Sequence, residues 1–521
     1  MAEVSRTARV IQNAKVALFF YCINLILQFF SRKIFLDYLG AELLGLNTTA
    51  QNLLQFLNIA ESGIGSAVAF ALYKPISQGN RDEINKILSV QGWFYRCVGF
   101  VVLLGSAILM LFFPLIFAKS QIPLVFAYGT YIAFLISALL GYFINYNIVL
   151  LSADQKEYQI TIPTQGVRAV KGVLQIYVVW QFSNGYVWWL GVEVLAACLT
   201  SLILLKVMKS TYPWLKPNLM LGSELRKDYS FLSTKIKQLF FHKIAGYVLT
   251  QTTPLVIFAF STLTTVAIYG NYWVIMVGCL VFMEAMSRGF TASVGNLVAE
   301  GNKEKIKKVF WEISTFRLFL AAGVCYGIVF LSDSFVSIWV GPDFIMQHEA
   351  MFVMTAVYFI QMQRTSDMFL YAYGLFSDIW APVVESFLNI SLSILLGYFW
   401  GLTGIFVGVL ISQIVIANSW KAMFLYVKGF KESVAEYVTK YTIKITLLVL
   451  IFFLISLIFD SSNFDIETLL DWVRCAVHFV VLYVILGGIV FYIADSSFRS
   501  LIGRFFKIIN FKILGSWVNN R

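Results

Sequence analysis

The sequence predicts an all-α protein that crosses a membrane many times, and three observations lead to this fold class. Hydrophobic residues make up 59% of the 521 residues and charged residues only 13%, with a mean hydropathy of +0.77. A soluble domain could not bury so much apolar surface. About fourteen apolar windows are long enough to cross a bilayer as helices, which takes about 20 residues each. The lysines and arginines between these windows gather on one side.

The windows fall into groups of six, six and two along the chain. The first group lies near residues 16–38, 43–73, 90–117, 122–151, 159–181 and 186–207. The second group lies near 235–260, 262–298, 309–331, 350–375, 380–400 and 402–427, and the last two windows near 441–459 and 472–493. We therefore expect an N-terminal lobe at 1–208, a polar cytoplasmic linker at 209–231, a C-terminal lobe at 232–430, and two further helices with a basic tail at 431–521.

A helix–turn–helix pattern occurs once in each predicted lobe. Residues 29–87 contain Gly-Leu-Asn47 and then Gly79-Asn80, and residues 256–309 contain Tyr-Gly-Asn271 and then Gly301-Asn302. A repeat at this distance indicates two related halves. Six predicted crossings separate the copies, so both have the same orientation. The halves should then be related by an axis along the membrane normal, as in transporters whose site lies between parallel repeats.

The two long windows at 43–73 and 262–298 exceed one crossing, so we expect them to bend, tilt or protrude. Glycines cluster at Gly63-Ile64-Gly65, which is typical of a bend or of close packing between helices. A second cluster, Gly404 to Gly408, is a G-x-x-x-G pattern that indicates ordinary close contact between helices.

The charge distribution predicts the orientation of the chain. If the N-terminus is cytoplasmic, nearly all loop lysines and arginines fall on the cytoplasmic side, whereas the outer segments 332–349 and 460–471 contain acids and no lysine or arginine. We expect both termini in the cytoplasm. The formal net charge of +11 therefore indicates membrane topology rather than nucleic acid as a partner. All six cysteines lie in apolar windows without C-x-x-C spacing, so neither disulfides nor a metal site is expected.

Ionisable residues inside the windows are the best evidence for a functional site. Each costs about 2.5 to 3.5 kcal/mol at the membrane centre, so it needs a partner or a wet cavity. Basic residues of this kind come from both lobes: Arg32, Arg168, Lys171, His242, Lys243, Arg288, Arg317 and Arg364. Together they predict a cationic cavity for an anionic ligand, phosphate above all. For any one of them the alternative is a structural pair, such as Glu284 with Arg288 or Arg364 with Asp367, or snorkelling of Arg32.

The acids Glu61, Asp367 and Glu385 lie in predicted spans and are candidates for coupling to H⁺ or Na⁺, with a packing hydrogen bond as the alternative. No other cofactor is expected. The sequence contains no catalytic pair of carboxylates and no nucleotide-binding loop.

Several segments resemble a known family. They are L-G-A-E-L-L-G-L-N at 39–47, N-I-A-E-S-G-I-G-S-A at 58–67, I-Y-G-N-Y at 268–272, S-V-G-N at 293–296, and A-Y-G-L-F-S-D-I-W-A-P-V-V-E-S-F-L-N-I-S-L-S-I-L-L-G at 372–397. Residues 10–430 resemble the polysaccharide-transport (Wzx-type) branch of the MOP flippase superfamily. In that family's pattern the first-span arginine is Arg32, the second-span acid is Glu61, and the tenth- and eleventh-span charges are Arg364 and Glu385.

The resemblance implies two six-helix lobes in a V around a central cationic cavity. It further implies a flippase that moves a polyprenyl-diphosphate-linked oligosaccharide across the bacterial inner membrane by alternating access, for O-antigen of lipopolysaccharide, capsule or exopolysaccharide. The partners would be this substrate, membrane lipid and the polysaccharide polymerase machinery. This chain departs from the pattern at Thr252-Thr253-Pro254, where relatives often carry an aspartate, so a coupling role there is not carried over.

Two alternatives belong to different classes. A MATE-like drug or metabolite antiporter of the same superfamily would favour an acidic or aromatic cavity for hydrophobic cations, whereas the charges inside these windows are mostly basic. An integral-membrane polysaccharide polymerase or glycosyltransferase would need a larger outer segment than the one at 332–349.

Overall fold

The computed structural model describes residues 6–61, 63–118, 120–218, 220–232, 236, 252–375, 378, 380–460 and 464–504. The chain forms two compact units, an N-terminal unit, Met1–Gly270, and a C-terminal unit, Asn271–Arg521. Within the described residues, nine helices are long and apolar enough to cross a membrane. The protein is therefore an all-helical, multi-pass membrane protein. The count of fourteen spans and the lobe boundaries stay predictions.

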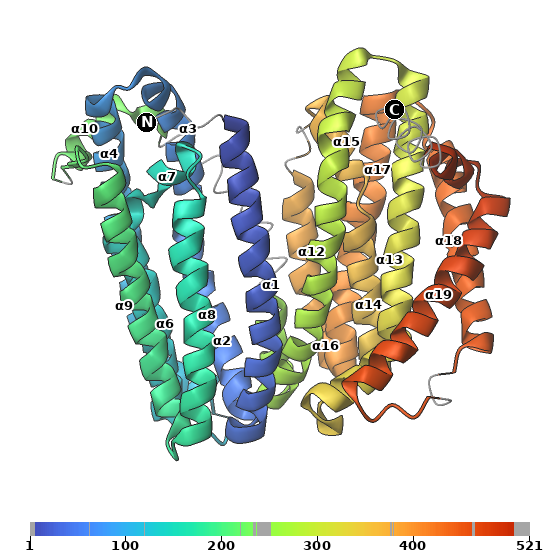
Figure 1. The fold of residues 1–521 in the computed structure, drawn as a ribbon, viewed down its shortest axis with the longest axis horizontal. Helices are drawn as coiled ribbons and strands as arrows, with labels where there is room; N and C mark the ends of the chain where they lie inside the picture. The colour runs from blue at the N-terminus through green and yellow to red at the C-terminus, as the bar shows by residue number, and fades with distance from the viewer. Residues whose placement is uncertain are drawn as a thin grey trace, which may run out of the picture. The chain divides into compact units, whose positions relative to one another are not determined.

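The N-terminal unit is built from long helices joined by short turns. Its long helices are α1 (Arg6–Leu39), α2 (Ala41–Asn58), α3 (Ile64–Gln78), α4 (Arg81–Leu111), α6 (Leu124–Phe143), α8 (Tyr158–Gln181) and α9 (Gly185–Thr211). Shorter pieces are η1 (Ile59–Glu61), α5 (Phe113–Ile116), η2 (Tyr146–Ile148), α7 (Val149–Ala153) and α10 (Gly222–Asp228). Helix α8 packs against α1 and α9, and α9 packs against α6 (Figure 1).

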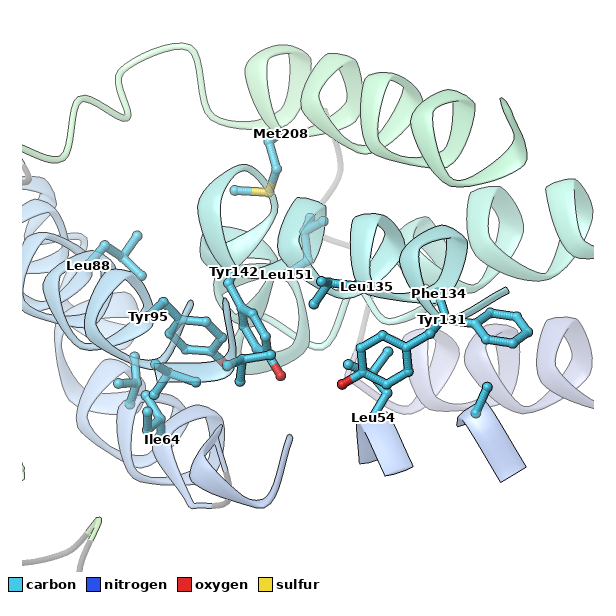
Figure 2. Packing of buried hydrophobic residues seen from close by; sticks show 14 of the residues in the cluster. Leu54, Ile64, Leu88, Tyr95, Tyr131, Phe134, Leu135, Tyr142, Leu151 and Met208 are labelled. Atoms are coloured by element: carbon cyan, nitrogen blue, oxygen red, sulfur yellow. The ribbon is translucent and has the colours of Figure 1, made fainter. Parts of the chain in front are cut away.

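Buried aromatic residues fill the core of this unit. Tyr131 is fully buried, and its hydroxyl lies 2.9 Å from the Ser106 hydroxyl. Figure 2 shows Tyr95 beside Tyr142, with 6.0 Å between the ring centroids, and Tyr142 donates a hydrogen bond of 2.8 Å to the Asn58 side chain. The rings are thus removed from lipid and water while their hydroxyls keep polar partners.

The C-terminal unit has the same construction. Its helices are α12 (Leu263–Glu300), which begins in the N-terminal unit, α13 (Lys303–Val340), α14 (His348–Gln363), α15 (Ser366–Tyr373), α16 (Trp380–Ser412), α18 (Val434–Ile458) and α19 (Leu469–Ala494). Shorter pieces are η3 (Pro342–Phe344), the π-helices η4 (Gln413–Trp420) and η5 (Leu425–Phe430), and α17 (Lys421–Phe424). Helix α13 packs against α14 and α19, and α14 packs against α16 (Figure 1).

Several predicted spans are interrupted in the structure. The window at 43–73 is broken around η1, where Gly63 has φ 99° and begins α3, so the bend expected at Gly63-Ile64-Gly65 is confirmed. The window at 350–375 is broken between α14 and α15. In α16 the backbone leaves helical geometry at Trp400 and Gly401, which is the turn between the windows predicted at 380–400 and 402–427.

The G-x-x-x-G pattern lies just after this last turn. A Cβ atom on Gly404 would collide with the Leu396 carbonyl, and one on Gly408 would collide with the Ser393 backbone. The chain therefore folds back on itself at Trp400–Gly401, and the two glycines allow close contact between its two arms.

The repeated Gly-Asn turn has the same structure in both units. Gly79 and Gly301 have φ of 66° and 77°, which glycine adopts without steric cost. Asn80 then caps α4 by accepting from the Glu83 amide at 3.1 Å, and Asn302 caps α13 by accepting from the Lys305 amide at 3.0 Å. Both side chains satisfy an amide that the first helical turn leaves free.

The segment predicted as a linker is folded onto α4. The Lys216 amide donates to the Asn85 side chain at 2.7 Å, the Asn218 amide donates to Ser89 at 2.8 Å, and the Arg226 guanidinium lies 4.6 Å from the Trp93 ring centroid. This segment is consequently a packed part of the N-terminal unit.

Candidate substrate-binding and coupling residues

Arg32 lies near the end of α1 and is held by the first turns of α12. Its Nη2 donates a hydrogen bond of 3.1 Å to the Ala267 carbonyl. Gly270 makes room for the guanidinium, because a Cβ atom at that position would collide with Nη2. The structure thus ties the predicted first-span cation to a neighbouring backbone, in addition to any role towards substrate.

Lys171 forms an ion pair that sequence reasoning missed. Its Nζ lies 2.7 and 2.9 Å from the two carboxylate oxygens of Glu193 on α9. Gln175, one turn further along α8, donates to the same carboxylate at 2.9 Å. Glu193 lies in the apolar window at 186–207, so the cost of a charge in the membrane applies to it as well, but its pairing with Lys171 depends on how α8 packs against α9.

Arg168 differs from Lys171 although both were expected to share one role. It is exposed, and no hydrogen bond or ion pair of its guanidinium is found among the described residues. Of the two cations on this helix, Lys171 is neutralised by Glu193, whereas Arg168 keeps its donors free of partners in the described part of the chain.

Glu61 lies at the break between α2 and α3. Its Oε1 accepts a hydrogen bond of 3.1 Å from the Tyr95 hydroxyl. The same carboxylate lines a pocket of about 490 Å³ whose wall also contains Asn58, Asn145 and Glu157. An acidic side chain in a polar pocket at a helix break can bind a cation or a proton.

In the C-terminal unit Arg317 binds the end of a broken helix. Its Nε and Nη2 both donate to the Met362 carbonyl, at 3.1 and 2.8 Å. Met362 lies in the last turn of α14, where carbonyls have no partner within the helix. The buried guanidinium therefore satisfies a backbone group that the break exposes.

The start of α15 carries a second group of charges. Asp367 accepts from Arg364 Nε at 2.7 Å and forms an ion pair with Lys421 Nζ at 3.0 Å. The pair of Arg364 with Asp367 was an alternative left open by the sequence. Lys421 was not among the site residues expected from the sequence.

Glu385 on α16 completes this group. Only 2% of its surface is exposed, and the charges of Arg364, Lys421 and Asp367 act on its carboxyl group. We call these five residues, Arg317, Arg364, Asp367, Glu385 and Lys421, the C-unit charge cluster. Its basic members outnumber its acidic ones by one, and the charge of Glu284, which also acts on Arg317, offsets this excess.

The remaining predicted site residues lie where the structure gives no side-chain description. His242 and Lys243 lie outside the described residues, and so does the side chain of Arg288. Their part in a cationic cavity stays a prediction.

Both units therefore hold a broken helix with an acidic side chain at or next to the break, Glu61 in one and Asp367 in the other. Non-helical backbone at membrane depth is tolerated only where protein or a wet cavity satisfies it. Interrupted helices of this kind form the substrate and ion sites of many transporters. The arrangement suits the binding of ions and of charged substrate groups.

No family model and no curated protein matches the sequence. Among solved structures, the lipid II flippase MurJ in an inward closed conformation is similar over 94% of this chain and 100% of its own, with a TM-score of 0.65 and 15% identity. An inward-facing multidrug resistance MATE family transporter of the MOP superfamily is similar over 77% of this chain and 94% of its own, with a TM-score of 0.58 and 15% identity.

The chain is therefore a multi-pass membrane protein with the fold of transporters and flippases. These structural neighbours are transporters and flippases, not enzymes. The particular fold is the one that MurJ and the MATE transporters of the MOP superfamily share. The expected superfamily fold is thus confirmed at the level of structure.

Proposed function

We propose that this protein is a flippase of the Wzx type. It moves polyprenyl-diphosphate-linked oligosaccharide repeat units across the bacterial inner membrane, for O-antigen, capsule or exopolysaccharide. The main support is the similarity to a flippase of a lipid-linked substrate, which extends over 94% of this chain and 100% of that one. The MATE similarity covers a smaller share, 77% of this chain.

The charges support a diphosphate as the group to be bound. Arg168 is exposed on α8 and has no partner among the described residues, so its planar fork of donors is available to phosphate oxygens. The C-unit charge cluster holds Arg317 and Arg364 near a helix break.

Coupling to H⁺ or Na⁺ is part of the proposal. Among the described residues Glu61 accepts a hydrogen bond from Tyr95, and it lines a pocket. Glu385 is almost fully buried. Protonation or cation binding at such a carboxylate would change the local charge, and alternation between two conformations would follow from that change.

A MATE-like antiporter is the second candidate, because one such transporter shares the fold at a TM-score of 0.58. An experiment in the source bacterium separates the two. Deletion of the gene should cause lipid-linked repeat units to accumulate on the cytoplasmic leaflet and should remove the surface polysaccharide. Wild-type protein should restore it, and an Arg168→Ala variant at equal abundance should not. Unchanged surface polysaccharide, together with increased sensitivity to cationic drugs, would favour the antiporter.

A further inference from the structure

A basic pocket of about 520 Å³ lies at one end of the C-terminal unit, apart from the C-unit charge cluster. Four lysines line it, Lys303, Lys307 and Lys308 of α13 and Lys440 of α18, together with Ser496 and Ser497. We call it the lysine–serine pocket. Its acidic lining residues are Glu304 and Glu432, and Glu436 pairs with two of the lysines, so positive charges exceed negative ones by one.

The pocket lies where three candidate membrane spans begin or end. Lys303 is the first residue of α13, Lys440 is in the second turn of α18, and Ser496 and Ser497 come directly after α19 ends at Ala494. These positions correspond to the membrane surface, the level of lipid headgroups. Basic pockets between helices at this level are suited to anionic headgroups.

The lysines of the pocket are not equivalent. Lys307 and Lys440 each lie 2.7 Å from a carboxylate oxygen of Glu436, so these two charges are compensated. In the described part of the chain, Lys303 and Lys308 have no such acidic partner. Their ammonium groups are consequently available to a ligand.

The wall that carries the serines is fixed in place. Asp495 pairs with the buried Lys444, and its other oxygen accepts from the Phe498 amide at 2.9 Å. Ser500 and Arg504 both bind Glu312 on α13, at 2.6 and 3.0 Å. These contacts hold residues 496–504 against α13, so the pocket does not depend on a ligand to form.

We propose that the lysine–serine pocket binds the phosphate of an anionic phospholipid headgroup. Lys303 and Lys308 supply charge-assisted hydrogen bonds, and the hydroxyls of Ser496 and Ser497 supply neutral donors. Inorganic phosphate offers the same chemistry, so the experiment has to separate the two sources. The proposal is independent of what the protein transports.

The test measures binding to the purified full-length protein in detergent by native mass spectrometry and by thermal unfolding. The probes are phosphatidylglycerol, phosphatidylcholine and inorganic phosphate. The test variant is Lys303→Gln with Lys308→Gln. The matched control is Lys305→Gln with Lys428→Gln, which removes the same charge outside the pocket: Lys305 pairs with Glu300, and Lys428 is exposed.

Phosphatidylglycerol should bind the wild type and the control variant and raise their unfolding temperature. Its affinity for the test variant should be lower by about tenfold or more, because charged hydrogen bonds are lost. A Lys303→Arg with Lys308→Arg variant should retain binding, which shows that charge and not folding is responsible. Protection by inorganic phosphate at least as strong as that by the lipid would assign the same pocket to free phosphate and contradict the headgroup. Equal loss in the test and control variants, or equal binding of both lipids, would overturn the proposal.

Discussion

At the scale of single residues, variants of the ion pair between Lys171 and Glu193 distinguish a role in stability from a role in transport. Lys171→Ala leaves the Glu193 carboxylate buried with Gln175 as its remaining side-chain donor. Loss of one partner of such a pair should lower the free energy of unfolding by about 3 kcal/mol. Replacing both residues, as Lys171→Met with Glu193→Leu, should restore most of that stability, and thermal unfolding of the purified variants measures it.

Transport by the same double variant then shows whether Lys171 does more than pair. Normal flipping would remove Lys171 from the substrate-binding residues. An unchanged unfolding temperature in Lys171→Ala would show that the ion pair itself contributes nothing to stability.

Arg168 should behave in the opposite way. Because its side chain is exposed, Arg168→Ala should change stability by no more than about 0.5 kcal/mol. Flipping should fall strongly, and Arg168→Lys should retain only part of it, since a point charge cannot form the paired hydrogen bonds of a guanidinium. The measurements are protein abundance and surface polysaccharide in the complemented strain. Full polysaccharide in Arg168→Ala cells would exclude this residue from the site.

The sequence identified the charged residues but not their partners. The cost of an ionisable group in the membrane marks Lys171 and Arg364 without any knowledge of the fold. The same cost applies to Glu193 and Lys421, which lie in the windows at 186–207 and 402–427, but the partners of these two residues depend on contacts between helices. The pair of Arg364 and Asp367 was an open alternative because the two residues are only three positions apart in the sequence, although in the structure Arg364 lies at the break before α15.

At the scale of elements, the two Gly-Asn turns should contribute equally. Asn80→Ala and Asn302→Ala should each lower the free energy of unfolding by about 1 kcal/mol, because each removes the cap of a long helix. Asn→Asp at the same positions should have little effect, as aspartate caps equally well. Thermal unfolding of the two alanine variants and of the two aspartate variants tests this. A large difference between the two alanine variants would argue against equivalent turns.

The positions of the spans were well predicted because the bilayer imposes length and hydropathy on every crossing. The windows at 90–117, 186–207 and 472–493 correspond to α4, α9 and α19. The interruptions were harder to predict. Gly63 signalled one of them, whereas the break between α14 and α15 has no glycine or proline, and the Met362 carbonyl before it is bound by Arg317.

At the scale of the whole molecule, the orientation can be tested by labelling single cysteines. In a background with Cys22→Ser and Cys97→Ser, which removes the two exposed native thiols, Asp343→Cys should react only with reagent applied outside. Gln78→Cys should react only after the inside is made accessible, because the basic loops face the cytoplasm. Both positions are exposed in the structure. The reverse pattern would invert the topology.

The central claim is that the chain flips a polyprenyl-diphosphate-linked oligosaccharide, and transbilayer movement in proteoliposomes tests it most directly. Purified protein is reconstituted with a fluorescent polyprenyl-diphosphate oligosaccharide, and an impermeant quencher reports the fraction that becomes accessible. The wild type should make lipid of the inner leaflet accessible far faster than empty liposomes or Arg168→Ala protein, and it should not move ethidium. Transport of ethidium without movement of the lipid-linked oligosaccharide would contradict the claim.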